Sequence, residues 1–127
     1  MKPRSEIRIL VVDDQKSMRG LAIYFLKQLD FEDIDEAENA RDALMQMQKK
    51  RYDLLLLDWN MEGMSGIDLL KAIRSIPELN KIKIIMATSE RSVEKVDEAK
   101  SFGADHYIVK PYELRDVEMR IVKVLEL

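Results

Sequence analysis

The chain alternates short apolar runs with segments in which apolar residues recur every three or four positions. The first run, 7–12, is rich in β-branched residues and stops at two acids. The next segment carries apolar residues at helical spacing. These are Met18, Leu21, Ala22, Phe25 and Leu29. Residues 54–57 are four consecutive leucines, a pattern typical of a strand covered on both faces.

The same alternation continues to the end of the chain. A turn containing Gly63, Ser65 and Gly66 separates the leucine run from the next helical pattern. The other expected elements are a weak strand around Ile34, a helix over 40–47, a helix through 69–73 followed by Pro77, a strand at 82–87, a helix over 92–102, a strand at 107–109 and a helix over 114–124.

Five strands alternating with five helices predict an α/β fold, a parallel sheet with helices on both faces. The right-handed crossover rule favours the flavodoxin-like, doubly wound strand order 2-1-3-4-5 at this size. No repeat, linker or low-complexity segment interrupts the pattern. We therefore expect residues 1–127 to form a single domain without an output domain.

Composition narrows the function. The chain has no cysteine and one histidine, His106, which excludes disulfides, thiolate sites and multi-histidine zinc sites. No signal peptide or apolar stretch of about 20 residues is present, so we expect a cytoplasmic protein that does not enter the membrane. The net charge of −3 gives no general attraction to nucleic acid.

Polar groups follow four of the expected strands. They are Asp13 and Asp14, Asp58, Thr88 and Lys110. With the proposed strand order, these four strands are contiguous and their carboxyl ends share one rim. Clustered carboxylates repel one another unless a cation or raised pKa values relieve them, and oxygen-only ligands favour Mg²⁺. The sequence therefore predicts a magnesium site at this rim.

Such a site suits phosphoryl transfer. A carboxylate can act as a nucleophile and form an aspartyl-phosphate, while a metal and a lysine offset charge on the phosphoryl oxygens. We expect Asp58 to be that nucleophile. Taken singly, each acid could instead be a solvated group or a helix cap, and Asp14 is a candidate N-cap. Complementary groups at four strand ends favour the functional interpretation.

Four motifs carry a resemblance to a known family. They are Val11-Val12-Asp13-Asp14, Leu57-Asp58-Trp59-Asn60-Met61, Met86-Ala87-Thr88-Ser89-Glu90 and Tyr107-Ile108-Val109-Lys110-Pro111-Tyr112. In this order and spacing the chain resembles, over essentially its whole length, the receiver domain of two-component response regulators. It is most similar to the single-domain chemotaxis regulators.

The resemblance implies a role for each matching residue. Asp58 accepts the phosphoryl group, and Lys110 and Thr88 contact that group. Mg²⁺ is held by Asp13, Asp14, Asp58 and the backbone carbonyl of Asn60, with Asp13 acting through water. Thr88 and Tyr107 form the switch, Asn60 and Glu90 tune dephosphorylation, and the Lys110-Pro111 peptide is commonly cis.

The resemblance also implies partners. A histidine kinase supplies the phosphoryl group, a phosphatase is a candidate for removing it, and an output protein such as the flagellar motor switch binds the face of helix four, strand five and helix five. The helix over 92–102 has a thin apolar stripe of Val93, Val96 and Ala99. That stripe suits either a solvated helix or a partner-binding surface, and the resemblance favours the surface.

Three residues need separate treatment. Glu62 stands where the family usually has proline, and it either lies in an exposed loop or alters Mg²⁺ affinity and phosphoryl lifetime. Trp59 follows the acceptor, and we expect it to be exposed near the pocket, where its fluorescence would report ligand binding. His106 is interpreted as a surface or packing residue.

Alternative functions remain open at this point. Within the family, the chain could be a phosphorelay shuttle or a phosphate sink. An aspartate-nucleophile phosphatase of the haloacid dehalogenase class is a remote alternative, because its two acids are separated by one residue whereas Asp13 and Asp14 are adjacent. A flavin carrier is disfavoured by the acidic first loop. We expect no enzyme activity beyond self-phosphorylation and autodephosphorylation.

Overall fold

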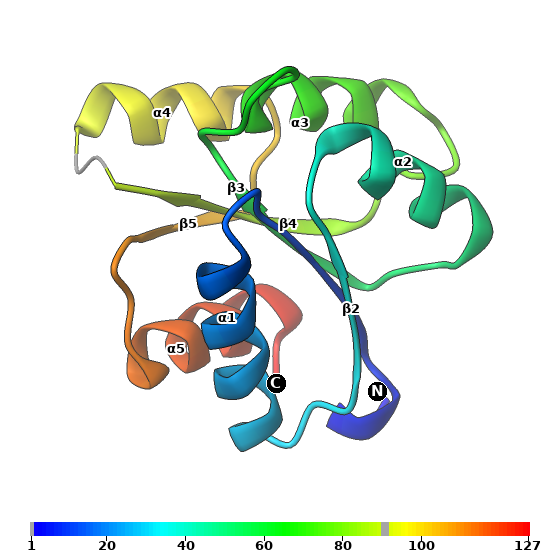
Figure 1. Ribbon diagram of the computed structural model, residues 1–127, viewed down its shortest axis with the longest axis vertical. Helices are drawn as coiled ribbons and strands as arrows, with labels where there is room; N and C mark the ends of the chain where they lie inside the picture. The colour runs from blue at the N-terminus through cyan, green and yellow to red at the C-terminus, as the bar shows by residue number, and fades with distance from the viewer. Residues whose placement is uncertain (1, 90–91) are drawn as a thin grey trace.

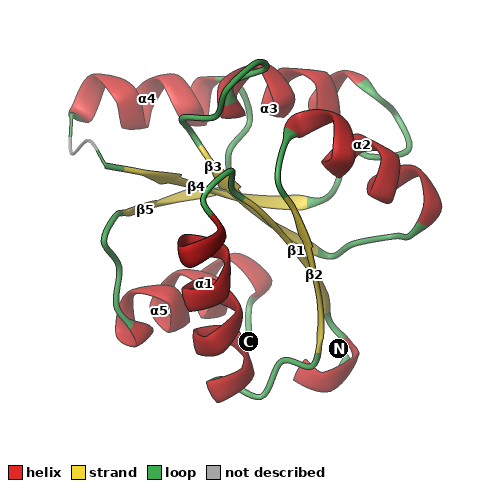
Figure 2. Ribbon diagram, in the orientation of Figure 1, coloured by secondary structure: helices red, strands yellow, loops and turns green. Residues whose placement is uncertain are grey.

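The protein is a parallel five-stranded sheet between two layers of helices (Figures 1 and 2). The computed structural model describes residues 2–89 and 92–127. The strands are β1 (Arg8–Val12), β2 (Asp33–Ala37), β3 (Leu54–Asp58), β4 (Lys83–Thr88) and β5 (His106–Val109). The helices are η1 (Arg4–Glu6, 3-10), α1 (Lys16–Gln28), α2 (Ala40–Lys49), α3 (Gly66–Ser75), α4 (Val93–Ser101) and α5 (Leu114–Leu125).

The strand order is β2-β1-β3-β4-β5, which confirms the flavodoxin-like prediction. Helices α1 and α5 cover one face of the sheet, and α2, α3 and α4 cover the other (Figure 1). Parallel pairing aligns the strand ends, with Val12 beside Leu57 and Asp58 beside Ala87. The carboxyl ends of β1, β3, β4 and β5 therefore meet at one rim.

Strand β3 is buried along its whole length, which explains the leucine run. Leu55 and Leu57 pack into the core under α2 and α3, whereas Leu54 and Leu56 pack into the core under α1 and α5. Side chains alternate between the faces of a strand, so a central strand between two helical layers needs apolar residues at every position.

Strand β2 is polar because it lies at the edge of the sheet. The Lys50 ammonium donates to Asp33 (2.6 Å) and Asp35 (2.8 Å), and the Tyr52 hydroxyl donates to Asp35 (2.6 Å). These hydrogen bonds satisfy carboxylates whose burial without partners in an apolar core would be costly. The weak strand expected around Ile34 is confirmed. Backbone pairing with β1 holds β2 in the sheet, although few of its side chains are apolar.

Helix α4 is thinly anchored. Among the described residues of this helix, Ala99 alone is buried, Val96 is half-buried, and Val93 is 73% exposed. Ser92 caps its first turn by accepting from the Lys95 amide (3.4 Å). Gly103, with φ of 105°, ends it in a conformation that L side chains rarely adopt. The predicted thin stripe is confirmed.

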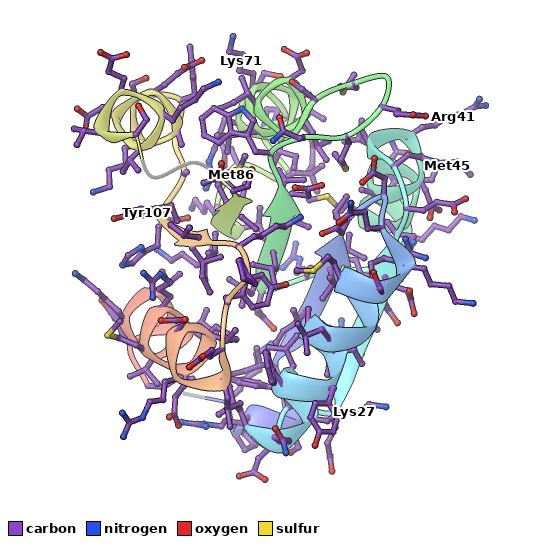
Figure 3. All side chains as sticks on the ribbon, turned by 60° about the vertical axis from the view of Figure 1, so that its left-hand side comes forward. Lys27, Arg41, Met45, Lys71, Met86 and Tyr107 are labelled. Carbon is purple, nitrogen blue, oxygen red and sulfur yellow. The ribbon has the colours of Figure 1, made fainter. Side chains whose placement is uncertain are left out.

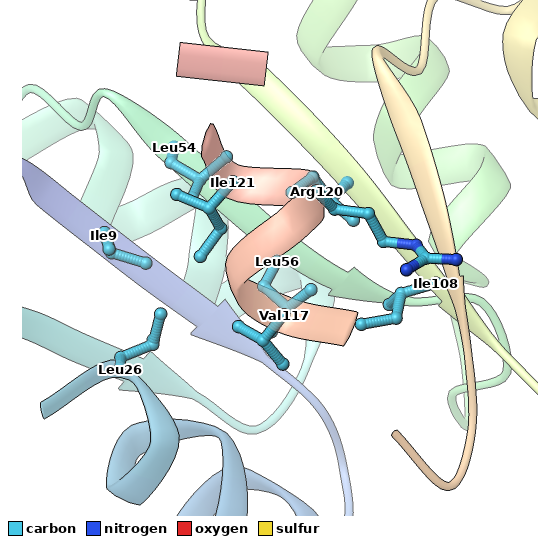
Figure 4. A pocket seen from close by; sticks show the side chains of 9 residues that line it. Ile9, Leu26, Leu54, Leu56, Ile108, Val117, Arg120 and Ile121 are labelled. Atoms are coloured by element: carbon cyan, nitrogen blue, oxygen red, sulfur yellow. The ribbon is translucent and has the colours of Figure 1, made fainter. Parts of the chain in front are cut away.

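The core under α5 holds a small void of about 10 Å³ (Figure 4). Its lining is apolar, and Arg120 contributes only the stem of its side chain, whose guanidinium group points away toward β5. Methionines divide between core and surface, since Met86 is fully buried and Met45 is 48% exposed (Figure 3). No helix in residues 2–89 and 92–127 is long and apolar enough to span a membrane.

Candidate functional site

The carboxyl rim of the sheet brings together the acids that the sequence singled out. Asp13 and Asp14 follow β1, and Asp58 is the last residue of β3. One carboxylate oxygen from each lies within 4.8 Å of those of the other two. Asp13 and Asp58 are buried, whereas Asp14 is exposed. The acids thus form a compact cluster that opens to solvent at Asp14.

Lys110 joins two of these acids. Its ammonium donates to Asp13 Oδ2 (2.8 Å) and to Asp58 Oδ1 (2.9 Å). The side chain of Lys110 is 14% exposed and those of both acids are 5% exposed. With all groups ionised, three carboxylates and one ammonium leave a net charge of about −2 in a partly desolvated site.

This surplus of negative charge perturbs the ionisation of Asp58. Burial raises the pKa of Asp58, and the neighbouring Asp13 raises it further, while the hydrogen bond from Lys110 opposes both. Burial alone would lower the pKa of Lys110, but its bonds to the two acids outweigh that effect and raise it. Lys110 therefore stays cationic, and ionised Asp58 is held in an unfavourable environment.

The loop after β1 is shaped by Asp13. Asp13 Oδ1 accepts from the Gln15 amide at 2.8 Å, and Gln15 is the N-cap residue of α1. Asp14 is therefore not the N-cap, and that alternative is wrong. Within the described residues the Asp14 carboxylate has no hydrogen-bond donor, so it is free to take a ligand from the solvent side.

The loop after β3 is fixed by backbone contacts. The Trp59 amide donates to the Ala87 carbonyl (2.8 Å), and the Gly66 amide donates to the Trp59 carbonyl (2.9 Å). A Cβ at Gly66 would overlap the Asp58 carbonyl oxygen, so only glycine fits there. The Asn60 amide donates to Asp58 Oδ1 (3.3 Å). The expected metal-binding role of the Asn60 carbonyl stays a prediction.

Trp59 does not lie where the sequence predicted. We expected an exposed ring, but Trp59 is 7% exposed and belongs to the core beneath α2, α3 and α4. The Lys95 ammonium from α4 sits 5.1 Å from its ring centroid. The backbone bond to Ala87 extends the pairing of β3 with β4 by one residue, so alternation along the strand places the Trp59 ring on the same face as Leu57. Trp59 can still report on the site through its neighbour Asp58.

Thr88 and Tyr107 occupy the adjoining strands. Thr88 ends β4, is 3% exposed, and its carbonyl accepts from the Lys110 amide (2.7 Å). Tyr107 is half-buried on β5, the far edge of the sheet (Figure 3). Arg120 of α5 donates to the Tyr107 carbonyl (2.6 Å) and stands 5.8 Å from its ring centroid.

The remaining predicted positions lie around this centre. The Lys110-Pro111 peptide is cis, and Glu62 is exposed. His106 Nδ1 accepts from the Tyr107 amide (2.8 Å), which agrees with a packing role. Glu90 lies outside the described residues.

Two residues near the site were not predicted. Gly66 was seen only as part of a turn, and its spacing from Asp58 carried no signal of the close backbone approach. Arg19 is 9% exposed and donates to the Asp13 carbonyl at 2.8 Å. Its position five residues after Asp14 was the only available signal.

Comparison with known proteins identifies the family. Residues 9–122 match the family described as "Response regulator receiver domain". The chain belongs to the response regulator receiver family. It is similar to the chemotaxis protein CheY-3 of Vibrio cholerae serotype O1, with 38% identity covering 94% of this chain and 92% of the relative. It is also similar to the chemotaxis protein CheY of Pseudomonas aeruginosa, with 36% identity covering 94% and 97%.

Solved structures of response regulators have the same fold as this chain. The chemotaxis response regulator CheY4 of Vibrio cholerae is 33% identical and superposes with a TM-score of 0.87, covering 93% of this chain and 98% of that one. A putative response regulator from Chloroflexus aurantiacus is 26% identical with a TM-score of 0.89, covering 99% and 100%. The receiver domain makes this a two-component signalling protein, which disfavours the phosphatase and flavin alternatives.

The acidic cluster fits a divalent cation. It offers oxygen ligands only, carries a charge of about −2, and includes one carboxylate without a donor among the described residues. Hard ions such as Mg²⁺ prefer such ligands and keep several waters. Asp13, Asp14 and Asp58 are therefore able to hold a metal ion.

Proposed function

We propose that Asp58 accepts a phosphoryl group from the phosphohistidine of a histidine kinase, with Mg²⁺ as cofactor. The observation that carries this proposal is the buried Asp58 carboxylate held 2.9 Å from Lys110 within an acidic cluster. Asp58 attacks phosphorus, the phosphorus–nitrogen bond to the donor breaks, and an acyl phosphate forms. The imidazole leaves, and a proton from solvent neutralises it.

The surrounding residues supply charge and orientation. Lys110 would move from its two carboxylates to the incoming phosphoryl oxygens, and the Thr88 hydroxyl would donate to one of them. Asp14, Asp58 and the Asn60 carbonyl would hold the metal directly, and Asp13 through water. Bound Mg²⁺ offsets charge on the acceptor and on the phosphoryl oxygens.

The output lies on the face of α4, β5 and α5. Phosphorylation adds a charge of about −1.5 to −2 and strong acceptor oxygens. Thr88 would turn toward them, and the space it leaves suits inward movement of Tyr107. This shifts the population between two packings of a thinly anchored α4.

The exposed side chains of this face suit a protein partner. Val93 of α4 and Met119 of α5 are 73% and 60% exposed. The similarity to chemotaxis proteins supports the flagellar motor switch as that partner. As part of the same proposal, the protein works in the cytoplasm.

Signal lifetime belongs to the same site. Asn60 and Glu90 would tune autodephosphorylation, a separate phosphatase would shorten the signal, and the chain turns over no other substrate. Glu62, exposed in the loop after β3, is a further candidate for tuning Mg²⁺ affinity, and Glu62→Pro tests it by Mg²⁺ titration and dephosphorylation rate. A phosphorelay shuttle or phosphate sink is the alternative, and it requires the same chemistry at Asp58.

Intact-mass measurement tests the proposal. The parent protein, incubated with acetyl phosphate and Mg²⁺, should gain one phosphoryl group, and Asp58→Asn should gain none. Absence of a gain in the parent, or an equal gain in the variant, would refute Asp58 as acceptor. A pull-down with and without a phosphoryl mimic then separates the roles, since a shuttle or sink would show no phosphorylation-dependent motor partner.

A further inference from the structure

The buried polar side chains of this protein lie at one place. Among the described residues, four polar or charged residues are buried: Asp13, Arg19, Asp58 and Thr88. Three of them belong to the proposed phosphorylation site. Arg19 is the fourth, and neither the family resemblance nor the proposed chemistry gives it a role. Burying a guanidinium is costly unless its hydrogen bonds are made, so its contacts need an explanation.

Arg19 makes two directed bonds. Its NH1 group donates to the Asp13 carbonyl (2.8 Å), and its Nε donates to Glu36 Oε1 (2.7 Å). The Arg19 side chain is 11% exposed and that of Glu36 is 50% exposed. The fork of the guanidinium thus joins the loop after β1 to edge strand β2. Glu36 offsets its charge, so that Arg19 competes little with a cation for the acids.

The Asp13 carbonyl belongs to the peptide group that precedes Asp14. The Asp13 amide is bound to the Ala37 carbonyl (3.1 Å) and its side chain to Gln15 and Lys110. Asp14 differs, since no hydrogen bond holds its carboxylate within the described part of the chain. Its direction therefore depends on the orientation of the Asp13-Asp14 peptide, and Arg19 fixes the carbonyl of that peptide.

We propose that Arg19 is a positioning residue that orients the Asp13-Asp14 peptide so that the Asp14 carboxylate points into the metal site. The proposal rests on the proposed function, because it assigns Asp14 to Mg²⁺. Groups that orient metal ligands typically contribute about 10–100-fold to metal affinity. Arg19 touches neither the phosphoryl donor nor the acceptor, so its effect should fall on Mg²⁺ binding rather than on the saturated rate.

The test compares Arg19→Ala, Arg19→Lys and the parent protein. Mg²⁺ affinity is measured by isothermal titration calorimetry, and phosphorylation by acetyl phosphate is followed at increasing Mg²⁺. We expect Arg19→Ala to weaken Mg²⁺ binding by about 10-fold or more, and the phosphorylation rate to return to the parent value at saturating Mg²⁺. Lysine keeps the charge without the fork, so Arg19→Lys should fall between the two.

Arg74→Ala is the matched control. Arg74 is also largely buried, with a 19% exposed side chain, and its guanidinium donates to the carbonyls of Gly103, Asn80 and Ile82. It lies at the opposite, amino-terminal edge of the sheet. Loss of a buried arginine in general should lower stability in both variants, whereas only Arg19→Ala should change Mg²⁺ affinity.

Each outcome decides the proposal. Mg²⁺ affinity within twofold of the parent in folded Arg19→Ala overturns it, as does a reduced saturated rate with unchanged affinity. Should Arg19→Ala fail to fold, Arg19→Lys decides by the same criterion, with parent-like affinity overturning the proposal. Failure of the proposed function is distinct, because the parent itself would then show no Mg²⁺-dependent phosphorylation.

Discussion

Removing the charge of Asp58 should stabilise the metal-free protein. One carboxylate oxygen of each acid lies within 4.8 Å of those of the others, and two unit charges at that limit interact by about 3.5 kcal/mol at an effective dielectric of about 20. At that separation the repulsion of Asp58 by Asp13 and Asp14 totals about 7 kcal/mol, and the exposure of Asp14 reduces its share. Attraction between Asp58 and the Lys110 ammonium, 2.9 Å away, offsets about 6 kcal/mol of this repulsion. These contributions nearly cancel, and the cost of burying the Asp58 charge remains.

The expected gain for Asp58→Asn is about 1–3 kcal/mol in the free energy of unfolding. At about 4 °C per kcal/mol for a chain of this size, the melting temperature should rise by about 4–12 °C. The raised pKa of Asp58 sets the pH dependence. Below the unfolded-state pKa the group is neutral in both states and costs nothing. As pH rises through the folded-state pKa, ionisation destabilises the parent, so the gain should be full near pH 7.5 and vanish near pH 3.5.

Urea and thermal unfolding in EDTA across this pH range measure the effect. Asp53→Asn is the matched control, because Asp53 is partly exposed at the opposite edge and bonds Lys2 (2.7 Å), so no stabilisation is expected. Mg²⁺ at 100 times its dissociation constant should add about 2.7 kcal/mol to the parent and much less to Asp58→Asn. Lower stability of Asp58→Asn than of the parent at pH 7.5 in EDTA would refute the reasoning.

Three further substitutions test single contacts. Gly66→Ala should destabilise the protein by more than about 3 kcal/mol, because its Cβ would overlap the Asp58 backbone, and denaturant unfolding measures this. Lys95→Gln should change the Trp59 emission spectrum with little loss of stability, because it removes an ammonium 5.1 Å from the ring; an unchanged spectrum would contradict that contact. Tyr52→Phe should cost about 1 kcal/mol in unfolding experiments by removing a hydrogen bond to β2, and a neutral result would show that bond to be negligible.

The sheet and its rim were predictable because their signals are periodic or topological. The leucines of β3 indicate a doubly covered strand without knowledge of any partner. Lys110 and Asp13 are 97 residues apart, yet both follow strands whose carboxyl ends share an edge, so strand order alone predicts their meeting.

The misplaced Trp59 and the unnoticed Arg19 depend on contacts of another kind. The Trp59 ring is buried because a backbone bond to Ala87 extends the pairing of β3 with β4 by one residue, and Lys95 on α4 lies over the ring; neither contact leaves a local pattern in the sequence. Arg19 is paired with a glutamate 17 residues away on an edge strand. In an isolated helical pattern, an arginine at that position is indistinguishable from a solvated one.

The division between apolar core and ionic rim explains how this fold can signal. Two apolar layers, separated by the sheet, supply stability without involving the rim. In the described chain every buried polar residue lies at that rim, where like charges are held together at a cost. A metal ion and a phosphoryl group would each change the charge balance of this cluster by several kcal/mol, and helix α4 is anchored by little more than Ala99. Phosphorylation at Asp58, as proposed, would therefore act through the charge balance of this rim, with Thr88 and Tyr107 carrying the change to α4.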